Sequence, residues 1–240
     1  MKRYESYPAL LAQHVDPILT EGIEFTVERR PLTELKGWEL MKGVFRSLAG
    51  FFEVVGVHCI VRWPWMAKAF EWDQPLRIQP AGHVGLLMTT NGDVLLEMKL
   101  EPGNHGRGHN FKIIWGPPIQ LGQAKLALLR DQGKAAPFDI VYARMEAGQA
   151  RVDIQAPGDG AREDKQNRMP FVVLNDNEIE EALTKMGDAA RLIVRVSPSV
   201  VRDIMRRGHG NIHLRESLAL LLLDQEFSRR WADSFLEAAI

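Results

Sequence analysis

Residues 95–104, with the sequence LLEMKLEPGN, form the stretch that decides the fold of this 240-residue chain. Glu97, Lys99 and Glu101 alternate with apolar residues, and a period of two sends the three charged side chains to one face of a strand. We expect the strand to stop at Pro102, which has no N–H to donate. The charged face either lies in solvent or lines a cleft. In a cleft, a carboxylate beside a lysine is suited to moving protons on a polar ligand.

Strand patterns dominate the sequence around this stretch, and a strong tight-turn signal, Asn91-Gly92, comes just before it. We expect strands at residues 23–29, in two runs within 43–61, and at 76–79, 84–89, 94–100, 111–115, 139–145, 149–155 and 171–174. We expect helices within residues 1–20, at 119–131, after a cap at Asp176 or Asn177, from Pro198 to about Gly208, and from about Leu214 onward. Strands followed by a helical final quarter predict an α+β fold, here as one module over residues 1–240.

The composition excludes some classes of partner and compartment. The chain has 30 Lys and Arg against 31 Asp and Glu, so it has no overall charge that would attract nucleic acid or an anionic membrane. Its single cysteine, Cys59, cannot form an internal disulfide, which suits a reducing compartment. No long apolar segment is typical of a secretory signal or a membrane span. We therefore expect a soluble, cytoplasmic protein.

Several common catalytic motifs are missing from the sequence. It contains no phosphate-binding GxxxxGK[ST] loop, no GxGxxG at a strand-to-helix turn and no GxSxG elbow. The seven histidines show no HExxH spacing. His105 and His109 are four residues apart, but glycines lie between them and no helix is expected there, so a metal site is disfavoured. The sequence predicts neither a metal nor a cofactor.

A collinear set of segments resembles a known family. The segments are GFFEVVGV (50–57), EWDQPLRIQ (71–79) followed by Gly82 and Gly85, LLEMKLEPGN (95–104), GDGAREDKQNRMPFVV (158–173) and GNIHLRESLALLL (210–222). In this order they resemble the NDP-hexose 2,3-dehydratase family, and W-x-QP and EPGN are the more specific pieces. The resemblance covers most of residues 32–223.

This resemblance implies a Nudix-like α+β fold. It also implies a nucleotide-linked 4-keto-6-deoxyhexose as the ligand, with dTDP as the expected nucleotide. Members of the family usually contain two tandem copies of the module, whereas this chain looks like one copy. A homodimer would replace the missing copy. The glutamate-dense helix of diphosphate-cleaving Nudix enzymes is absent, which argues against a magnesium-dependent hydrolase.

The implied reaction needs an acid, a base and donors for an enolate, but no metal or redox cofactor. We assign Glu101 the acid or base role, Lys99 the neutralisation of the enolate or the binding of phosphate, and His109 the role of partner acid. The competing interpretations give these residues no catalytic role. Glu101 would be a strand-end carboxylate, Lys99 would form a surface ion pair that adds little stability, and His109 would be a solvated loop histidine.

Further residues are candidates for binding the nucleotide sugar. Trp72 could stack on a thymine or uracil ring, although a tryptophan in the core is the competing interpretation. The polar edges of the base or sugar, and the diphosphate, are assigned to five more side chains: Gln74, Gln79, Asn104, Asn167 and Arg168. The competing interpretations are that the amide side chains belong to turns and that Arg168 is a surface arginine.

The chain also departs from the family pattern. Phe45-Arg46-Ser47 stands where the family has a polar, often histidine-containing stretch, and the segment after Asn104 differs most. Three alternatives therefore stay open. The protein could be a non-catalytic nucleotide-sugar-binding partner, a different enzyme on the same scaffold, or a structural domain whose charged strand is only a wet face.

Overall fold

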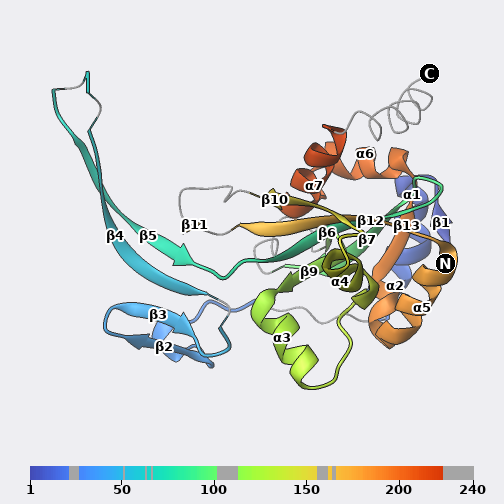
Figure 1. Cartoon of the computed structure of the whole chain (residues 1–240), viewed down its shortest axis with the longest axis horizontal. Helices are drawn as coiled ribbons and strands as arrows, with labels where there is room; N and C mark the ends of the chain where they lie inside the picture. Colours follow the sequence, from blue (N-terminus) through green and yellow to red (C-terminus); the bar gives the residue numbers. More distant parts are fainter. Residues whose placement is uncertain are drawn as a thin grey trace.

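The computed structural model describes residues 1–21, 27–50, 52–62, 64–65, 67–101, 113–155, 162–163 (backbone only) and 166–223. Within these residues the strands form two separate sheets (Figure 1). Helices and strands both contribute substantially, which confirms the predicted α+β class. The Nudix-like detail of that class stays a prediction.

The larger sheet forms the body of the protein (Figure 1). Its strands are β1 (Arg3–Tyr4), β6 (Gly82–Thr89), β7 (Val94–Leu100), β8 (Ile113–Gly116), β9 (Ile119–Gly122), β10 (Arg151–Gln155), β12 (Asn167–Leu174) and β13 (Ile193–Val196). The order is β1-β13-β7-β6-β12-β10, with β8 paired to β7 and β9 to β6. Among the described strands of this sheet, only the β1–β13 and β6–β12 pairs are parallel.

Helices cover both faces of the body sheet. They are α1 (Tyr7–Leu10), α2 (Asp16–Thr20), α3 (Gln123–Asp131), α4 (Asp139–Glu146), α5 (Asp176–Met186), α6 (Pro198–Arg206) and α7 (Ile212–Leu222), with a π-helical turn at Leu11–Val15 and 3-10 turns at Leu32–Glu34 and Gly187–Leu192. One apolar cluster joins Leu86 and Met88 of β6 to α1, α6 and α7. A second joins Leu87 of β6 to α3, α4 and α5. Every residue of β6 is buried, as expected for a strand covered on both faces.

The two central strands separate beyond the turn that joins them. At the predicted Asn91-Gly92 turn, Gly92 takes a φ of +81°, a left-handed conformation that favours glycine. Strands β6 and β7 then pair only at Leu87–Leu95 and Met88–Val94. The β8–β9 unit fills the resulting fork, because β8 pairs with the end of β7 and β9 with the start of β6.

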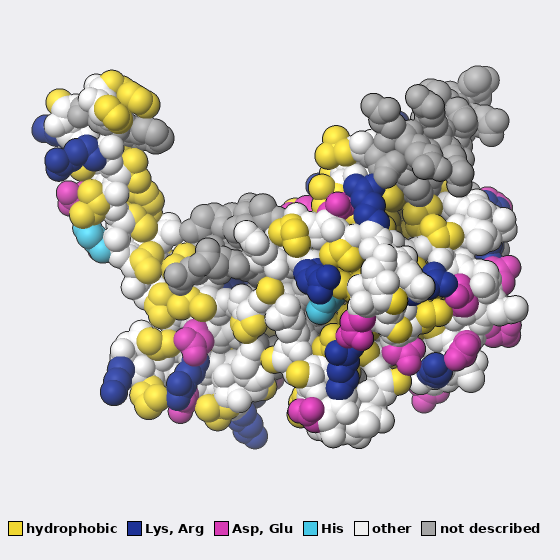
Figure 2. Space-filling view, in the orientation of Figure 1, with side chains coloured by type: hydrophobic (Ala, Val, Ile, Leu, Met, Phe, Trp, Pro, Cys, Tyr) yellow, Lys and Arg dark blue, Asp and Glu magenta, His cyan; other side chains and the backbone are white. Residues whose placement is uncertain are grey.

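The smaller sheet contains β2 (Trp38–Met41), β3 (Val44–Ser47), β4 (Glu53–Val61), β5 (Phe70–Ile78) and β11 (Arg162–Glu163), in the order β11-β5-β4-β3-β2. Strands β4 and β5 pair along their whole lengths. Strand β3 reaches only Glu53 and Val54, and β11 reaches only Arg77 and Ile78. The outer part, residues 55–61 and 70–76, is therefore a two-stranded ribbon, here called the arm, that projects from the body (Figures 1 and 2).

Some local predictions were wrong. Residues 139–145 were expected to form a strand but lie in helix α4, where Val141, Tyr142 and Met145 share the helical face that packs into the second cluster. The predicted helix at 119–131 begins with strand β9 and becomes helical only at Gln123. Helix α5 is capped by Asn175, whose side chain accepts from the N–H of Glu178, rather than by Asp176 or Asn177.

Candidate functional site

The charged side of β7 is partly covered in the folded protein. Lys99 and Glu97 form an ion pair with 2.6 Å between the Lys99 Nζ and a Glu97 carboxylate oxygen. Their side chains are only 18% and 24% exposed. The strand is therefore not the fully wet face that one interpretation of the sequence required.

Gly116 of β8 leaves space for three polar side chains beside the charged side of β7. A Cβ atom at Gly116 would lie 2.5 Å from the side-chain nitrogen of Gln120, 2.7 Å from that of Asn211 and 3.1 Å from the Cε of Lys99. Such distances cannot be accommodated without a shift of these side chains, so only glycine fits the arrangement. We call Lys99, Glu101, Gln120 and Asn211 the Gly116 cluster.

Helix α7 fixes Asn211 in this cluster. Its side-chain oxygen caps the helix by accepting from the N–H of Leu214 at 2.9 Å, and its backbone N–H donates to the carbonyl of Trp115 at 2.9 Å. The remaining side-chain N–H₂ donates to a Glu101 carboxylate oxygen at 3.5 Å. Because Asn211 is buried and held at three points, it orients the Glu101 carboxylate at the positive end of the helix.

A cavity of about 180 Å³ adjoins the Gly116 cluster at Gln120, and Gln79, His83, Asn167 and His213 also line it. Both ends of the Asn167 amide are engaged within the protein. Its nitrogen donates to the Gln155 side chain at 2.6 Å, and its oxygen accepts from the Gly82 N–H at 3.0 Å. In this arrangement Asn167 ties β12 to β6 and β10.

Gln79 and Pro80 also line a larger hollow of about 600 Å³ at the base of the arm. Its apolar wall includes Phe52, over whose ring the Arg77 guanidinium lies at 4.3 Å. The two hollows meet at Gln79 and Pro80. Together they offer an aromatic surface at one end and amide groups at the other.

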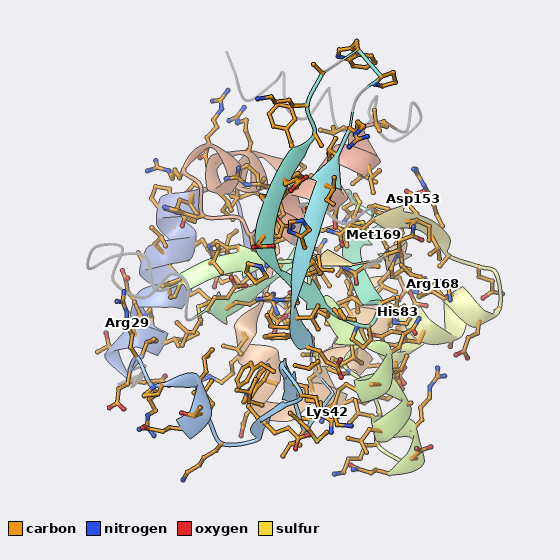
Figure 3. The ribbon with its side chains drawn as sticks, turned by 90° about the vertical axis from the view of Figure 1, so that its left-hand side faces the viewer. Arg29, Lys42, His83, Asp153, Arg168 and Met169 are labelled. Carbon is orange, nitrogen blue, oxygen red and sulfur yellow. The ribbon has the colours of Figure 1, made fainter. Side chains whose placement is uncertain are left out.

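Arg168 lies in a different hollow from its neighbour Asn167. It lines a cavity of about 390 Å³ together with His83, Arg130 and Tyr142, and Figure 3 shows His83 and Arg168 near each other above helix α3. Burial lowers the pKa of His83, and the positive charge of Arg168 lowers it further. Since His83 borders both this cavity and the one around Asn167, the neutral ring stands between the two.

The remaining predicted residues are not in the Gly116 cluster. Trp72 and Gln74 lie on the arm, where the indole N–H of Trp72 donates to the Gln74 side chain at 3.0 Å. Trp72 is 43% exposed, so it is not a core residue of this chain. Asn104 and His109 lie outside the described residues.

Four residues of this region were not predicted from the sequence: Gln120, Asn211, His213 and His83. Asn211 and His213 fall inside the segment GNIHLRESLALLL, so its resemblance to a helix entry was a usable signal. The expectation of a helix at 119–131 concealed the strand position of Gln120. Nothing in the sequence distinguished His83 from an ordinary buried histidine.

Among the described residues, no three His, Cys, Asp or Glu side chains gather in a way that suits a metal ion. None of the described helices combines the length and hydrophobicity that a membrane crossing requires.

Comparison with known proteins identifies the family. The family model for NDP-hexose 2,3-dehydratase matches residues 19–187, which include the arm, the fork of the body sheet and most of the candidate site. A search of curated proteins finds no match. The matched segment covers well over half of the sequence, and the chain belongs to the NDP-hexose 2,3-dehydratase family.

Proposed function

We propose that this protein removes water from a 4-keto-6-deoxyhexose that is linked to a nucleotide, which we propose to be dTDP. A base takes the C3 proton, which the C4 ketone acidifies, and an enolate forms. The C2 hydroxyl then leaves as water with a proton from an acid, and the C2–C3 enol rearranges to a 3,4-diketone. The observation that carries the proposal is the Gly116 cluster, where the Glu101 carboxylate, the side chain of Lys99 and two amides lie together.

The proposed roles follow from the chemistry of these groups. Glu101, held by Asn211, acts as acid or base. Lys99 and the side-chain amides of Gln120 and Asn211 donate to the developing negative charge on the C4 oxygen. His109 keeps its proposed role as the partner acid, and Asn104 its role as a ligand contact.

The nucleotide portion is proposed to bind along the hollows that meet at Gln79. The wall that includes Phe52 suits a base or ribose, and the amides around Asn167 suit sugar hydroxyls or phosphate oxygens. Arg168 is proposed as a diphosphate contact, because a guanidinium matches phosphate geometry. Trp72 and Gln74, carried by the arm, are proposed to read the base from a second copy in a homodimer.

A proton-exchange experiment tests the catalytic role of Glu101. The Glu101→Gln variant and the unchanged protein are incubated in D₂O with a dTDP-linked 4-keto-6-deoxyhexose. We expect deuterium uptake at C3 and diketone formation to fall by about 10²–10⁴-fold in the variant, as for loss of a general acid or base. Glu180→Gln, on the exposed side of α5, serves as control and should leave both rates unchanged. Undiminished exchange with lost diketone formation would make Glu101 the acid rather than the base, and undiminished rates of both would remove it from the mechanism.

The same assay separates catalysis from binding alone. A ligand present at 100 times its dissociation constant should stabilise the folded protein by about 2.7 kcal/mol. If the sugar nucleotide raises the melting temperature but no diketone forms, the protein is a binding partner rather than a dehydratase. Comparing dTDP with UDP in the same measurement tests the choice of nucleotide.

A further inference from the structure

The arm presents one apolar face and one polar face. The strand register puts eight side chains on one side, here called the inner face: Val55, Val57, Cys59, Val61, Phe70, Trp72, Gln74 and Leu76. The opposite, outer face carries Gly56, His58, Ile60, Glu71, Asp73 and Pro75. Only Gln74 on the inner face is polar, and its side-chain oxygen accepts from the Trp72 indole N–H on the same face. The inner face is therefore uncharged.

Nothing in the described part of the chain covers this face. Phe70 is 54% exposed and Trp72 is 43% exposed. Figure 2 shows hydrophobic side chains along the side of the arm that faces the body, charged and histidine side chains on the opposite side, and an open space between arm and body. A two-stranded ribbon is at best marginally stable in water, and an antiparallel sheet normally packs its apolar face against another layer.

We propose that the inner face of the arm packs against the inner face of the same arm in a second copy of this chain. This contact specifies where the two copies of the proposed homodimer meet. The inner face offers no charge that an acidic or basic partner could match. An identical apolar ribbon is complementary to it under two-fold symmetry, because each copy supplies the same patch. The arm also lies inside the segment that the family model matches.

The chemistry of the arm favours face-to-face packing over the pairing of strand edges. Pro75 has no N–H, and a proline in a sheet is confined to positions outside the hydrogen-bonded ladder, so its ring nitrogen lies at the free edge of β5. A proline at that edge hinders the addition of another strand. Stacked sheets lie about 10 Å apart, and the inner face borders the open space between arm and body (Figure 2).

The expected contact area requires more than the arm alone. A stable interface removes about 800 Å² from each partner, and an aromatic side chain buries roughly 150–250 Å² when fully covered. The half-exposed Phe70 thus supplies the centre of the contact, and Trp72, which is proposed to read the base, lies at its rim. Body surface beside the base of the arm supplies the remainder, and the outer face of each arm stays in solvent.

A matched pair of charge substitutions tests the proposal. Phe70 and Ile60 are 54% and 59% exposed and lie at the same end of the ribbon, but on opposite faces. Light scattering after gel filtration, across a dilution series, should show a dimer for the unchanged chain. We expect Phe70→Glu to weaken it at least about 30-fold, as for loss of a central aromatic anchor. Ile60→Glu should stay within about threefold of the unchanged chain, since surface changes cost little. A monomeric unchanged chain, or equal effects of both variants, would overturn the contact.

The single cysteine provides a second, independent measurement. Cys59 lies on the inner face, so a maleimide should label it slowly when the protein is dimeric and rapidly after dilution to monomer. In the control Cys59→Val/Ile60→Cys the thiol lies on the outer face and should react at the same rate in both states. A dimer in which Cys59 reacts freely overturns the inner-face contact while leaving a homodimer intact. Failure of the dehydratase assay in a protein that passes both tests would refute only the proposed activity.

Discussion

The body and the arm contain strands with similar alternating patterns, yet the two regions are covered very differently. In the body, β7 packs Leu96 and Met98 into one apolar cluster and Leu95 into the other. In the arm, β4 and β5 form a ribbon whose apolar face carries two half-exposed aromatic residues. The difference teaches that alternation assigns side chains to faces but does not say what covers a face. Matched substitutions in the two regions measure how much that cover contributes.

Tryptophan truncation should give the largest contrast. Trp115 of β8 is fully buried in the first cluster, whereas Trp65 at the tip of the arm is 77% exposed. We expect Trp115→Ala to lower the free energy of unfolding by about 3–5 kcal/mol, because it removes contacts and leaves a cavity. Trp65→Ala should change it by less than about 0.5 kcal/mol. Urea denaturation at several protein concentrations makes the comparison, and equal losses would mean that the arm is packed as tightly as the body.

Carboxylate removal should give the next largest contrast. Asp93 is fully buried and accepts from the Nε of Arg3 and of Arg195, each at 2.7 Å. Asp93→Ala should cost about 3 kcal/mol, because the partly buried Arg195 loses its buried partner and keeps the exposed Asp176. Asp73 on the arm is 85% exposed and pairs with His58, so Asp73→Ala should cost less than about 1 kcal/mol. Thermal unfolding of both variants provides the test, and a loss at Asp73 as large as that at Asp93 would contradict it.

Adding a methyl group should change stability in opposite directions in the two regions. At Gly85 a Cβ would lie 2.7 Å from the Pro170 ring and 3.1 Å from the Ile119 side chain, so Gly85→Ala should destabilise by about 1–3 kcal/mol. At Gly56 of the arm, a Cβ meets nothing within 4 Å. Gly56→Ala should therefore be neutral or stabilise by about 0.5 kcal/mol, because it reduces the freedom of the unfolded chain. Destabilisation at Gly56 would show that another surface packs against the outer face of the arm.

The pH dependence should show the smallest effect, and it arises in the body. Burial is the main cause that lowers the pKa values of His14, His83 and His209. The unfolded chain then binds protons more readily than the folded one, so stability is complete above the ordinary histidine pKa of about 6.5 and declines as the pH falls below it. Unfolding free energies between pH 7.5 and 5 should show this decline. The slope should be shallower in His83→Gln, and an unchanged slope would exclude His83 as a contributor.

Much of the body could be predicted from sequence because its signals are local. The bounds of β7, the Asn91-Gly92 turn and the start of α6 at Pro198 agree with the structure. Strand β6, the most deeply buried, was found except for its first two residues. The α4 helix was missed because its apolar residues satisfy both a strand and a helix period over a short window.

The candidate site was only partly predictable because it is assembled from distant segments. Glu101 and Asn211 are 110 residues apart in sequence, and their hydrogen bond depends on how α7 packs beside β8. Gly116 carries no pattern of its own, yet it sets the space for three side chains. Trp72 has a distinctive sequence context, which suggested a core residue or a ligand contact. Its position on the two-stranded arm depends on tertiary structure and could not be predicted from that context.

The fork in the body sheet also bears on how the chain can vary. Strands β6 and β7 are joined by two registered pairs, and the β8–β9 wedge carries Gly116 and Gln120 between them. The wedge is tied to its neighbours through the β7–β8 and β6–β9 ladders rather than through the β6–β7 turn. Substitutions in β8 and β9 therefore alter the surroundings of Gly116 and Gln120 without touching the two residue pairs that join β6 to β7, so the candidate site can vary while the centre of the sheet is kept.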